Sequence, residues 1–270
     1  MHPELFGFVK SFGLMLASSF ALGMLLSVRR GRARGVTPET VLDLVFAVLV
    51  SSVVGVRALY VATHAADFRP WYEAFYIWDG GLTLYGGVLA ATATVWWLCR
   101  RRGVAFLTIA DTFSPGVALG IGLTRIGCFL AGCCFGKPTD CPLGVHFPPG
   151  APATVVFGAR ALHPTQLYAS AAGFLVWGLL LLAERRPSGR GATFGRFLAL
   201  YGLARFGEDL LRYYEPEQMV LGLSNNQWLS LGLVAGGVFV LARVSRGAAD
   251  DRVAVATGRA VAPRAGGRRG

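Results

Sequence analysis

The sequence predicts an all-α integral membrane protein, a bundle of seven transmembrane helices. Hydrophobic residues make up 54% of the chain and charged residues only 15%, and the charges gather in short patches between long apolar runs. Soluble chains carry about 25% charged residues, whereas a bilayer protein keeps its charges between its spans. The net charge of +11 does not indicate a nucleic-acid partner, because no basic face with interleaved aromatic residues accompanies it.

Seven apolar stretches reach or approach the roughly 20 residues that a helix needs to cross the hydrocarbon. They are Leu5–Val28, Val41–Thr63, Leu82–Leu98, Thr108–Ala131, Gln166–Ala183, Phe194–Leu211 and Asn225–Ala242. The first is unlike a cleaved signal peptide, because its leader lacks basic residues and its basic cluster follows the apolar run. We expect one membrane domain over residues 1–245 and a disordered basic cytoplasmic tail over residues 246–270.

Arginine clusters alternate with loops that are poor in Lys and Arg. The clusters follow the first, third and fifth spans, at residues 29–34, 100–102 and 185–190, and the tail after the seventh span is basic again. Basic loops stay on the cytoplasmic side of a membrane. The pattern therefore predicts an external N-terminus and a cytoplasmic C-terminus.

Ionisable residues inside the spans are functional candidates, since each costs roughly 2.5–3.5 kcal/mol to insert. Arg57 lies in the second span and Arg125 near the outward end of the fourth. The sixth span places Arg205, Glu208 and Arg212 on one helical stripe. Two interpretations stay open: structural ion pairs along that stripe, or a cavity that binds phosphate, which guanidinium groups bind bidentately.

Two further motifs lie at the outward ends of spans. Asp79 and two glycines precede the third span, and Tyr85, Gly86 and Gly87 follow closely. Glycine pairs permit tight turns whose N–H groups bind anions, while Asp79 can cap a turn or bind an arginine.

His163 precedes the fifth span, with Gln166 and Tyr168 just beyond it. The histidine is expected at the outer interface, where it serves either as a functional group or as a cap for the backbone.

Together these residues resemble the prolipoprotein diacylglyceryl transferase family of inner-membrane enzymes. The motifs run in the family's order along most of the chain: Gly55-Val56-Arg57, Trp78–Gly81 with Gly86-Gly87, Asp111 with Pro115, Arg125-Ile126-Gly127, Gly132 and Gly136, His163-Pro164 with Gln166-Leu167-Tyr168, and Tyr201-Gly202 with Arg205-Phe206, Glu208 and Arg212. Their order, their spacing and their places in a layout with an external N-terminus carry the resemblance.

The resemblance implies transfer of diacylglycerol from phosphatidylglycerol to the lipobox cysteine thiol of exported prolipoproteins, with a thioether formed and glycerol phosphate released. It implies the bacterial inner (cytoplasmic) membrane, with phosphatidylglycerol, prolipoproteins and the lipid bilayer as partners, and neither a metal nor another cofactor. Arg125, Arg205 and Tyr85 are the implied catalytic positions, the arginines for headgroup binding and leaving-group stabilisation. The implied substrate-binding set is Arg125, Arg57, Asp79, Gly86, Gly87, His163, Gln166, Tyr168, Glu208 and Arg212.

The chain departs from the family pattern at four places, and the first is Phe12, which stands where the family has a tyrosine in the first span. Tyr85 stands where the family has the histidine proposed as base towards the thiol, and a phenol is a poorer base than an imidazole at neutral pH. Cys128 replaces an asparagine, and the segment Cys133-Cys134 replaces a glutamate.

Four of the five cysteines cluster at or beyond the outer end of the fourth span: Cys128, Cys133, Cys134 and Cys141. Because the compartment outside the inner membrane is oxidising, we expect a disulfide between Cys133 and Cys141. Zinc is disfavoured, because no Cys-x-x-Cys pair is present. Two alternatives remain for a divergent paralogue: a membrane thiol-redox or metal module, or a lipid-binding protein without catalysis.

Overall fold

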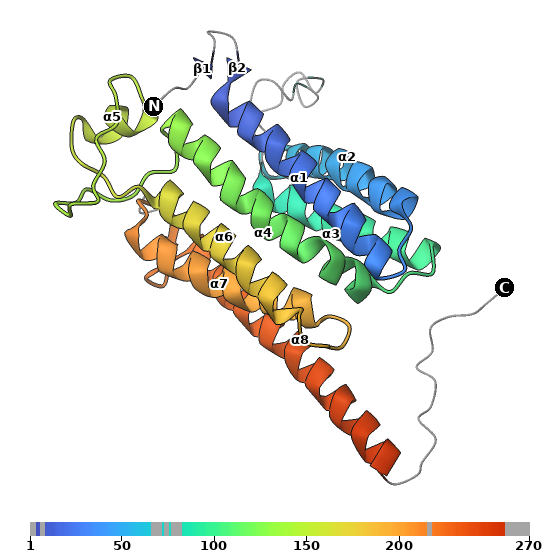
Figure 1. Cartoon of the computed structure of the whole chain (residues 1–270). Coiled ribbons are helices and arrows are strands. Elements are labelled where there is room, and N and C mark those ends of the chain that lie inside the picture. The colour runs from blue at the N-terminus through green and yellow to red at the C-terminus, as the bar shows by residue number, and fades with distance from the viewer. Residues whose placement is uncertain are drawn as a thin grey trace. The chain divides into compact units, whose positions relative to one another are not determined.

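The computed structural model describes residues 4–5, 9–65, 72, 76, 83–214 and 218–256, and it is built from helices (Figure 1). Each predicted span coincides with a long helix. These helices are α1 (Ser11–Ala33), α2 (Pro38–Thr63), α3 (Leu84–Arg101), α4 (Phe106–Ala131), α6 (Thr165–Ala183), α7 (Ala192–Leu211) and α8 (Asn225–Ala256). The short helix α5 (Pro152–Phe157) and two antiparallel ribbons, β1 (Glu4–Leu5) with β2 (Val9–Lys10) and β3 (Met219–Val220) with β4 (Leu223–Ser224), complete the described elements.

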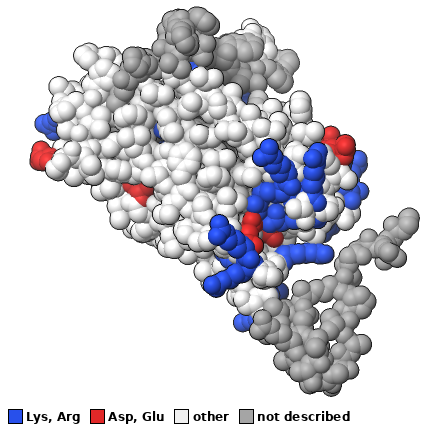
Figure 2. All heavy atoms as spheres, viewed as in Figure 1, with Lys and Arg blue, Asp and Glu red and all other residues white. Residues whose placement is uncertain are grey.

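Among the described helices, α1, α2, α4, α6 and α8 are long and apolar enough to cross a membrane. Large apolar side chains stand exposed on their flanks, such as Phe46 on α2 at 70% and Leu175 on α6 at 62%. On the face drawn in Figure 2 these flanks are almost free of charged side chains. Such surfaces suit lipid rather than water. The prediction of an α-helical, multi-pass membrane protein is confirmed.

The ends of two predicted segments differ in the structure. The first helix begins at Ser11 rather than at Leu5, because residues 4–5 pair with residues 9–10 as a ribbon. At the other end α8 continues to Ala256, into the predicted tail. Residues 246–256 are rich in alanine, which favours helix, and residues 257–270 lie outside the described part of the chain.

The chain divides into two compact units, residues 1–27 with 110–262 and residues 28–109 with 263–270. In the larger unit, α1 packs closely on α4, since a Cβ added at Gly116 would lie 2.9 Å from the Gly23 carbonyl oxygen. Ser170 on α6 donates a 2.8 Å hydrogen bond to the Gly122 carbonyl on α4. Helices α6 and α7 are neighbours, as are α7 and α8 (Figure 1).

Asp111 fastens the start of α7 to α4. Its carboxylate accepts hydrogen bonds from the backbone N–H groups of Gly191, at 2.6 Å, and Phe194, at 2.8 Å. A carboxylate at a helix N-terminus satisfies unpaired N–H groups and interacts favourably with the helix dipole. The residue at the N-cap position is Gly191, which has no side chain for this purpose. Asp111 therefore performs a structural function, capping a helix other than its own.

In the smaller unit, α2 and α3 lie against each other at a pair of glycines. A Cβ added at Gly86 would lie 2.1 Å from the carbonyl oxygen of Gly55. At the opposite end of the pair, Arg102 after α3 forms an ion pair with Asp43 near the start of α2. The two helices are thus antiparallel neighbours whose backbones touch at Gly55 and Gly86.

We predict that Gly86→Ala lowers the unfolding temperature of the detergent-solubilised protein by several degrees. The added methyl group would force α2 and α3 apart, and overpacking of this kind costs typically 1–3 kcal/mol. Gly178→Ala on α6 is the matched control, because a Cβ there meets no atom within 4 Å and alanine favours helix by about 1 kcal/mol. An unchanged unfolding temperature for Gly86→Ala would contradict this close packing.

Candidate active site

Arg205 on α7 is buried between two carboxylates of its own helix. Its Nη1 atom lies 2.8 Å from Glu208 Oε1 and 2.9 Å from Asp209 Oδ1. The side chains of Glu208 and Asp209 are 8% and 0% exposed. Spacings of three and four residues bring all three groups to one face of the helix. The predicted Arg205–Glu208 ion pair is present. Arg212 lies one residue beyond the end of α7 in an extended conformation, so the predicted helical stripe stops short of it, and Glu208 forms no ion pair with Arg212 within 4 Å.

Tyr214, just beyond the end of α7, joins this ion pair to α8. Its hydroxyl accepts from Arg205 Nη2 at 3.1 Å and from Asn226 Nδ2 at 3.0 Å, and donates to Asp209 Oδ1 at 2.7 Å. Burial raises the pKa of Tyr214, so the hydroxyl keeps the proton that it donates. Ser224 adds a 3.2 Å hydrogen bond to Asp209 Oδ2. Arg205 is therefore fixed in place by a network that spans α7 and the start of α8.

Arg125 lies on α4 in the same unit and is half-buried. Its charge interacts with those of Glu208 and Arg205 and with the thiols of Cys134 and Cys128. No described residue forms an ion pair with it within 4 Å. Arg205 is thus directly ion-paired to two carboxylates, while Arg125 feels the charge of Glu208 without a direct ion pair within 4 Å to a described residue.

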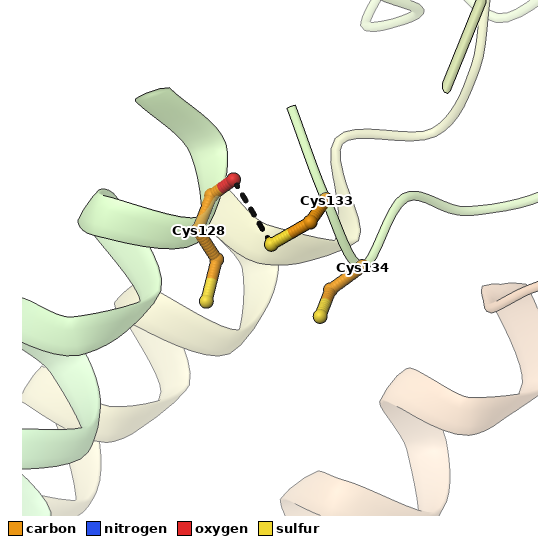
Figure 3. A group of neighbouring side chains, drawn as sticks. All are labelled: Cys128, Cys133 and Cys134. Atoms are coloured by element: carbon orange, nitrogen blue, oxygen red, sulfur yellow. Dashed lines mark hydrogen bonds between the residues drawn. The ribbon is translucent and has the colours of Figure 1, made fainter. Parts of the chain in front are cut away.

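The loop after α4 turns three cysteines towards one another. Gly132 ends the helix with φ 70°, and Cys134 also has a positive φ of 62°, a conformation that costs a non-glycine residue free energy. The Sγ atoms of Cys128, Cys133 and Cys134 all lie within 4.8 Å of one another. Figure 3 shows the three side chains, with Cys133 Sγ donating to the Cys128 carbonyl at 3.7 Å.

The first turn of α6 holds this loop by two hydrogen bonds. Thr165 Oγ1 donates to the carbonyl of Cys134 at 2.9 Å, and Gln166 Nε2 donates to that of Cys133 at 2.6 Å. Both side chains are fully buried. The predicted site residue Gln166 therefore lies beside the cysteines, where it positions their backbone.

The three thiols differ in acidity because of their different surroundings. The neighbouring thiols of Cys128 and Cys133, followed by the charges of Arg212 and Arg125, hold the pKa of Cys134 below its ordinary value. The neighbouring thiols of Cys128 and Cys134, together with burial, raise the pKa of Cys133. The surroundings therefore favour a thiolate at Cys134 over one at Cys133.

His163, Tyr168 and Arg212 lie at the same end of this unit. His163 Nδ1 is 3.4 Å from the Tyr168 hydroxyl, and the His163 carbonyl accepts from Gly136 N–H at 3.0 Å. Arg212 pairs with Gly136 as an isolated β-bridge, and its guanidinium lies 5.5 Å from the ring centre of Tyr214. The structure thus gathers these residues with Arg125, Arg205, Glu208 and Gln166 at the ends of α4, α6 and α7.

Other predicted site residues belong to the smaller unit. Arg57 on α2 is buried and lies 5.8 Å from the ring centre of Tyr60, and Tyr85 on α3 is 41% exposed. Gly86 and Gly87 lie inside α3 against α2 rather than in an open turn. Helix packing accounts for the two glycines. The headgroup contacts of Arg57, Gly86 and Gly87 and the catalytic role of Tyr85 stay predictions. Asp79 lies outside the described residues.

All five cysteines are free thiols in this structure, and Cys141 is exposed. Cys133 groups with Cys128 and Cys134 instead of pairing with Cys141. The Cys133–Cys141 disulfide stays a prediction for the oxidised protein.

Comparison with known proteins decides the family. The model of the prolipoprotein diacylglyceryl transferase family matches residues 4–243. The chain belongs to the prolipoprotein diacylglyceryl transferase family. A relative from Clostridium tetani is 32% identical over 240 residues, covering 88% of this chain and 94% of the relative. Another, from Vibrio vulnificus, is 35% identical over 256 residues, covering 92% of each. Both are named phosphatidylglycerol–prolipoprotein diacylglyceryl transferase.

The sequence did not predict four members of the Arg205 network. Asp209 and Tyr214 contact Arg205 itself, Ser224 bonds to Asp209, and Asn226 bonds to Tyr214. Asp209 was detectable, because it follows Arg205 by four residues and belongs to the same helical face. The other three lie beyond the end of α7, and their approach to Arg205 depends on the turn that leads into α8.

We predict that Tyr214→Phe destabilises the protein by about 1–3 kcal/mol, since it leaves buried polar groups of the Arg205 network without their partner. Thermal unfolding in detergent measures the effect. Tyr213→Phe is the matched control, because the neighbouring tyrosine is 36% exposed and its ring packs on Phe157. Equal unfolding temperatures for the two variants would show that the Tyr214 hydroxyl does not support the network.

Proposed function

We propose that this protein transfers the diacylglyceryl group of phosphatidylglycerol to the lipobox cysteine of exported prolipoproteins. The printed names of its relatives state this activity for them, and the family match extends over nearly the whole chain. The observation that carries the proposal is the contrast between Arg205, which is directly ion-paired to two carboxylates, and Arg125, which feels the charge of Glu208 but forms no ion pair within 4 Å to a described residue.

The reaction requires a group that accepts developing negative charge. The substrate thiolate attacks the glyceryl carbon that bears the phosphate ester, the carbon–oxygen bond breaks, and glycerol phosphate leaves with the bonding electrons. The leaving phosphate gains charge as this bond breaks. A prearranged guanidinium beside its oxygens stabilises the transition state more than the ground state. Arg125 is suited to this role because its charge is not already neutralised by an ion pair to a described residue.

Arg205 supports the same step from a fixed position. Its ion pairs with Glu208 and Asp209 and its hydrogen bond to Tyr214 hold the guanidinium in one orientation. A hydrogen-bond donor that does not reorganise during the reaction stabilises the transition state more than a mobile donor does. Arg212, His163 and Tyr168 complete the headgroup site in the larger unit. The resemblance to the family implies Arg57, Asp79, Gly86 and Gly87 as further headgroup-binding residues.

The membrane arrangement is part of the proposal. We place seven spans in the bacterial inner membrane, with α3 and α7 crossing despite their polar residues, and the N-terminus outside. In the larger unit, the arginine-rich loop at residues 184–191 lies beside the second half of α8, since a Cβ at Gly189 would lie 2.8 Å from Val244 Cγ1. Both segments are basic, which supports a cytoplasmic position for that end. The site at the other end then opens towards exported prolipoproteins.

Replacement of Arg125 by alanine is expected to lower diacylglyceryl transfer by about 10²–10³-fold, with insertion and expression unchanged. Arg125→Lys should restore little, because an ammonium group cannot reproduce bidentate phosphate binding. Transfer is measured in vesicles that contain phosphatidylglycerol and a lipobox peptide. Arg160→Ala, which removes an exposed arginine of the loop after α4, controls for lost positive charge. Wild-type rates in Arg125→Ala would remove this arginine from the mechanism.

The orientation predicts which thiols react from outside the cell. An impermeant maleimide should label wild-type spheroplasts at the exposed Cys141, and this labelling should be lost in Cys141→Ser. Arg101→Cys, made in that background at the exposed last residue of α3, should stay unlabelled until the membrane is permeabilised. The opposite pattern would mean that the membrane topology is inverted.

A further inference from the structure

The cysteine triad, Cys128, Cys133 and Cys134, has the geometry of a three-ligand metal site. Its sulfur atoms lie within 4.8 Å of one another, and zinc–sulfur bonds of about 2.3 Å in a tetrahedral site set the sulfurs about 3.8 Å apart. Small side-chain rotations therefore suffice to bind one ion. The sequence spacing lacks the usual Cys-x-x-Cys pair, and the positive φ of Cys134 brings the adjacent Cys133 and Cys134 side chains to the same point instead.

We propose that the triad binds a zinc ion whose fourth coordination position takes the thiol of the incoming lipobox cysteine. This inference rests on the proposed function for the identity of the thiol, while the metal site itself stands on the triad alone. Catalytic zinc sites combine three protein ligands with one open position.

The surroundings of the triad suit an anionic metal complex. A zinc ion with three thiolates carries one net negative charge, and Arg125 interacts electrostatically with both Cys128 and Cys134. Arg212 also acts on Cys134. Two guanidinium groups thus favour the deprotonated sulfurs that metal binding requires.

Side chains outside the triad also fix the loop by hydrogen bonds, as is common around metal ligands. Thr165 and Gln166 fix the carbonyls of Cys134 and Cys133. The Oε1 atom of Gln166 is buried without a hydrogen-bond partner among the described residues. An unsatisfied buried acceptor costs about 1–3 kcal/mol, and it offers a polar partner for a water or a substrate N–H at this site.

A bound zinc ion would also promote deprotonation of the incoming thiol, the step for which this chain lacks the family's histidine. The lipobox thiol binds to the metal and releases its proton to solvent, because zinc strongly favours the thiolate. The thiolate sulfur then forms a bond to the glyceryl carbon while the carbon–oxygen bond to phosphate breaks. Glycerol phosphate departs as the anion, and the neutral thioether, a weaker ligand, leaves the zinc ion. The ion is neither oxidised nor reduced, and Tyr85 need not act as a base.

The first test is zinc binding by the full-length protein in detergent, reduced and freed of metal. Titration with zinc against a chromogenic chelator should give one site per chain. Affinity should fall roughly tenfold or more in Cys128→Ser and Cys133→Ser and stay unchanged in Cys141→Ser, which alters an exposed cysteine outside the triad. If a variant fails to fold, the wild-type titration decides: absence of a stoichiometric site overturns the proposal, as does binding that folded triad variants retain.

The second test asks whether the substrate completes the coordination. Thiolate-to-metal charge-transfer absorption of the cobalt-substituted protein should increase when a lipobox peptide is added. The matched peptide with serine in place of cysteine should leave the spectrum unchanged. An unchanged spectrum with the cysteine peptide would make the zinc structural and overturn the substrate role. An increase without any lipid transfer in phosphatidylglycerol vesicles would instead refute the proposed function and leave the metal site standing.

Discussion

A guanidinium inside an apolar helix bundle has to be neutralised, and much of this protein's polar architecture follows from how Arg205 meets that requirement. Two carboxylates of α7, Glu208 and Asp209, lie within 2.9 Å of its Nη1 atom. Asp209 is completely buried and in turn needs the hydroxyl groups of Tyr214 and Ser224. These contacts fix the end of α7 against the start of α8. Breaking such a buried pair is strongly destabilising, so the geometry of this end of the bundle is rigid.

The opposite end of α7 is fixed by a different charge. Asp111 of α4 caps the N-terminus of α7 with two hydrogen bonds, while Lys137 Nζ donates to the Leu210 carbonyl at its C-terminus, at 3.0 Å. The helix dipole favours both contacts, because the negative charge lies at the N-terminus of α7 and the positive charge at its C-terminus. With α7 held at both ends, Arg125 on α4 and Arg205 on α7 keep a defined relation. Arg205 is directly ion-paired and Arg125 is not, an asymmetry that supports the proposed binding of an anionic headgroup.

The sequence predicted the long helices and the charged stripe because apolar length and helical spacing are local properties. Arg125, Arg205 and Glu208 were found for that reason. Tyr214 was not, because its contact with Arg205 depends on a turn rather than on periodicity. The close packing of Gly86 against α2 was not predicted, because only the approach of the two helices reveals it. The cysteine triad could not be predicted from sequence spacing, because its geometry depends on the positive φ of Cys134. Spacing rules for metal ligands take no account of backbone conformation.

The central claim is that Arg125, beside a neutralised Arg205, binds the phosphate of an anionic lipid. Equilibrium binding of short-chain phosphatidylglycerol and of the matching diacylglycerol, which lacks the phosphate, tests it most directly on the purified protein. We expect the wild-type protein to bind phosphatidylglycerol at least about tenfold more tightly, the effect of roughly one charge-assisted hydrogen bond, and we expect Arg125→Gln to abolish that preference. Equal affinity for the two lipids in the wild-type protein, or an unchanged preference in the variant, would contradict the account.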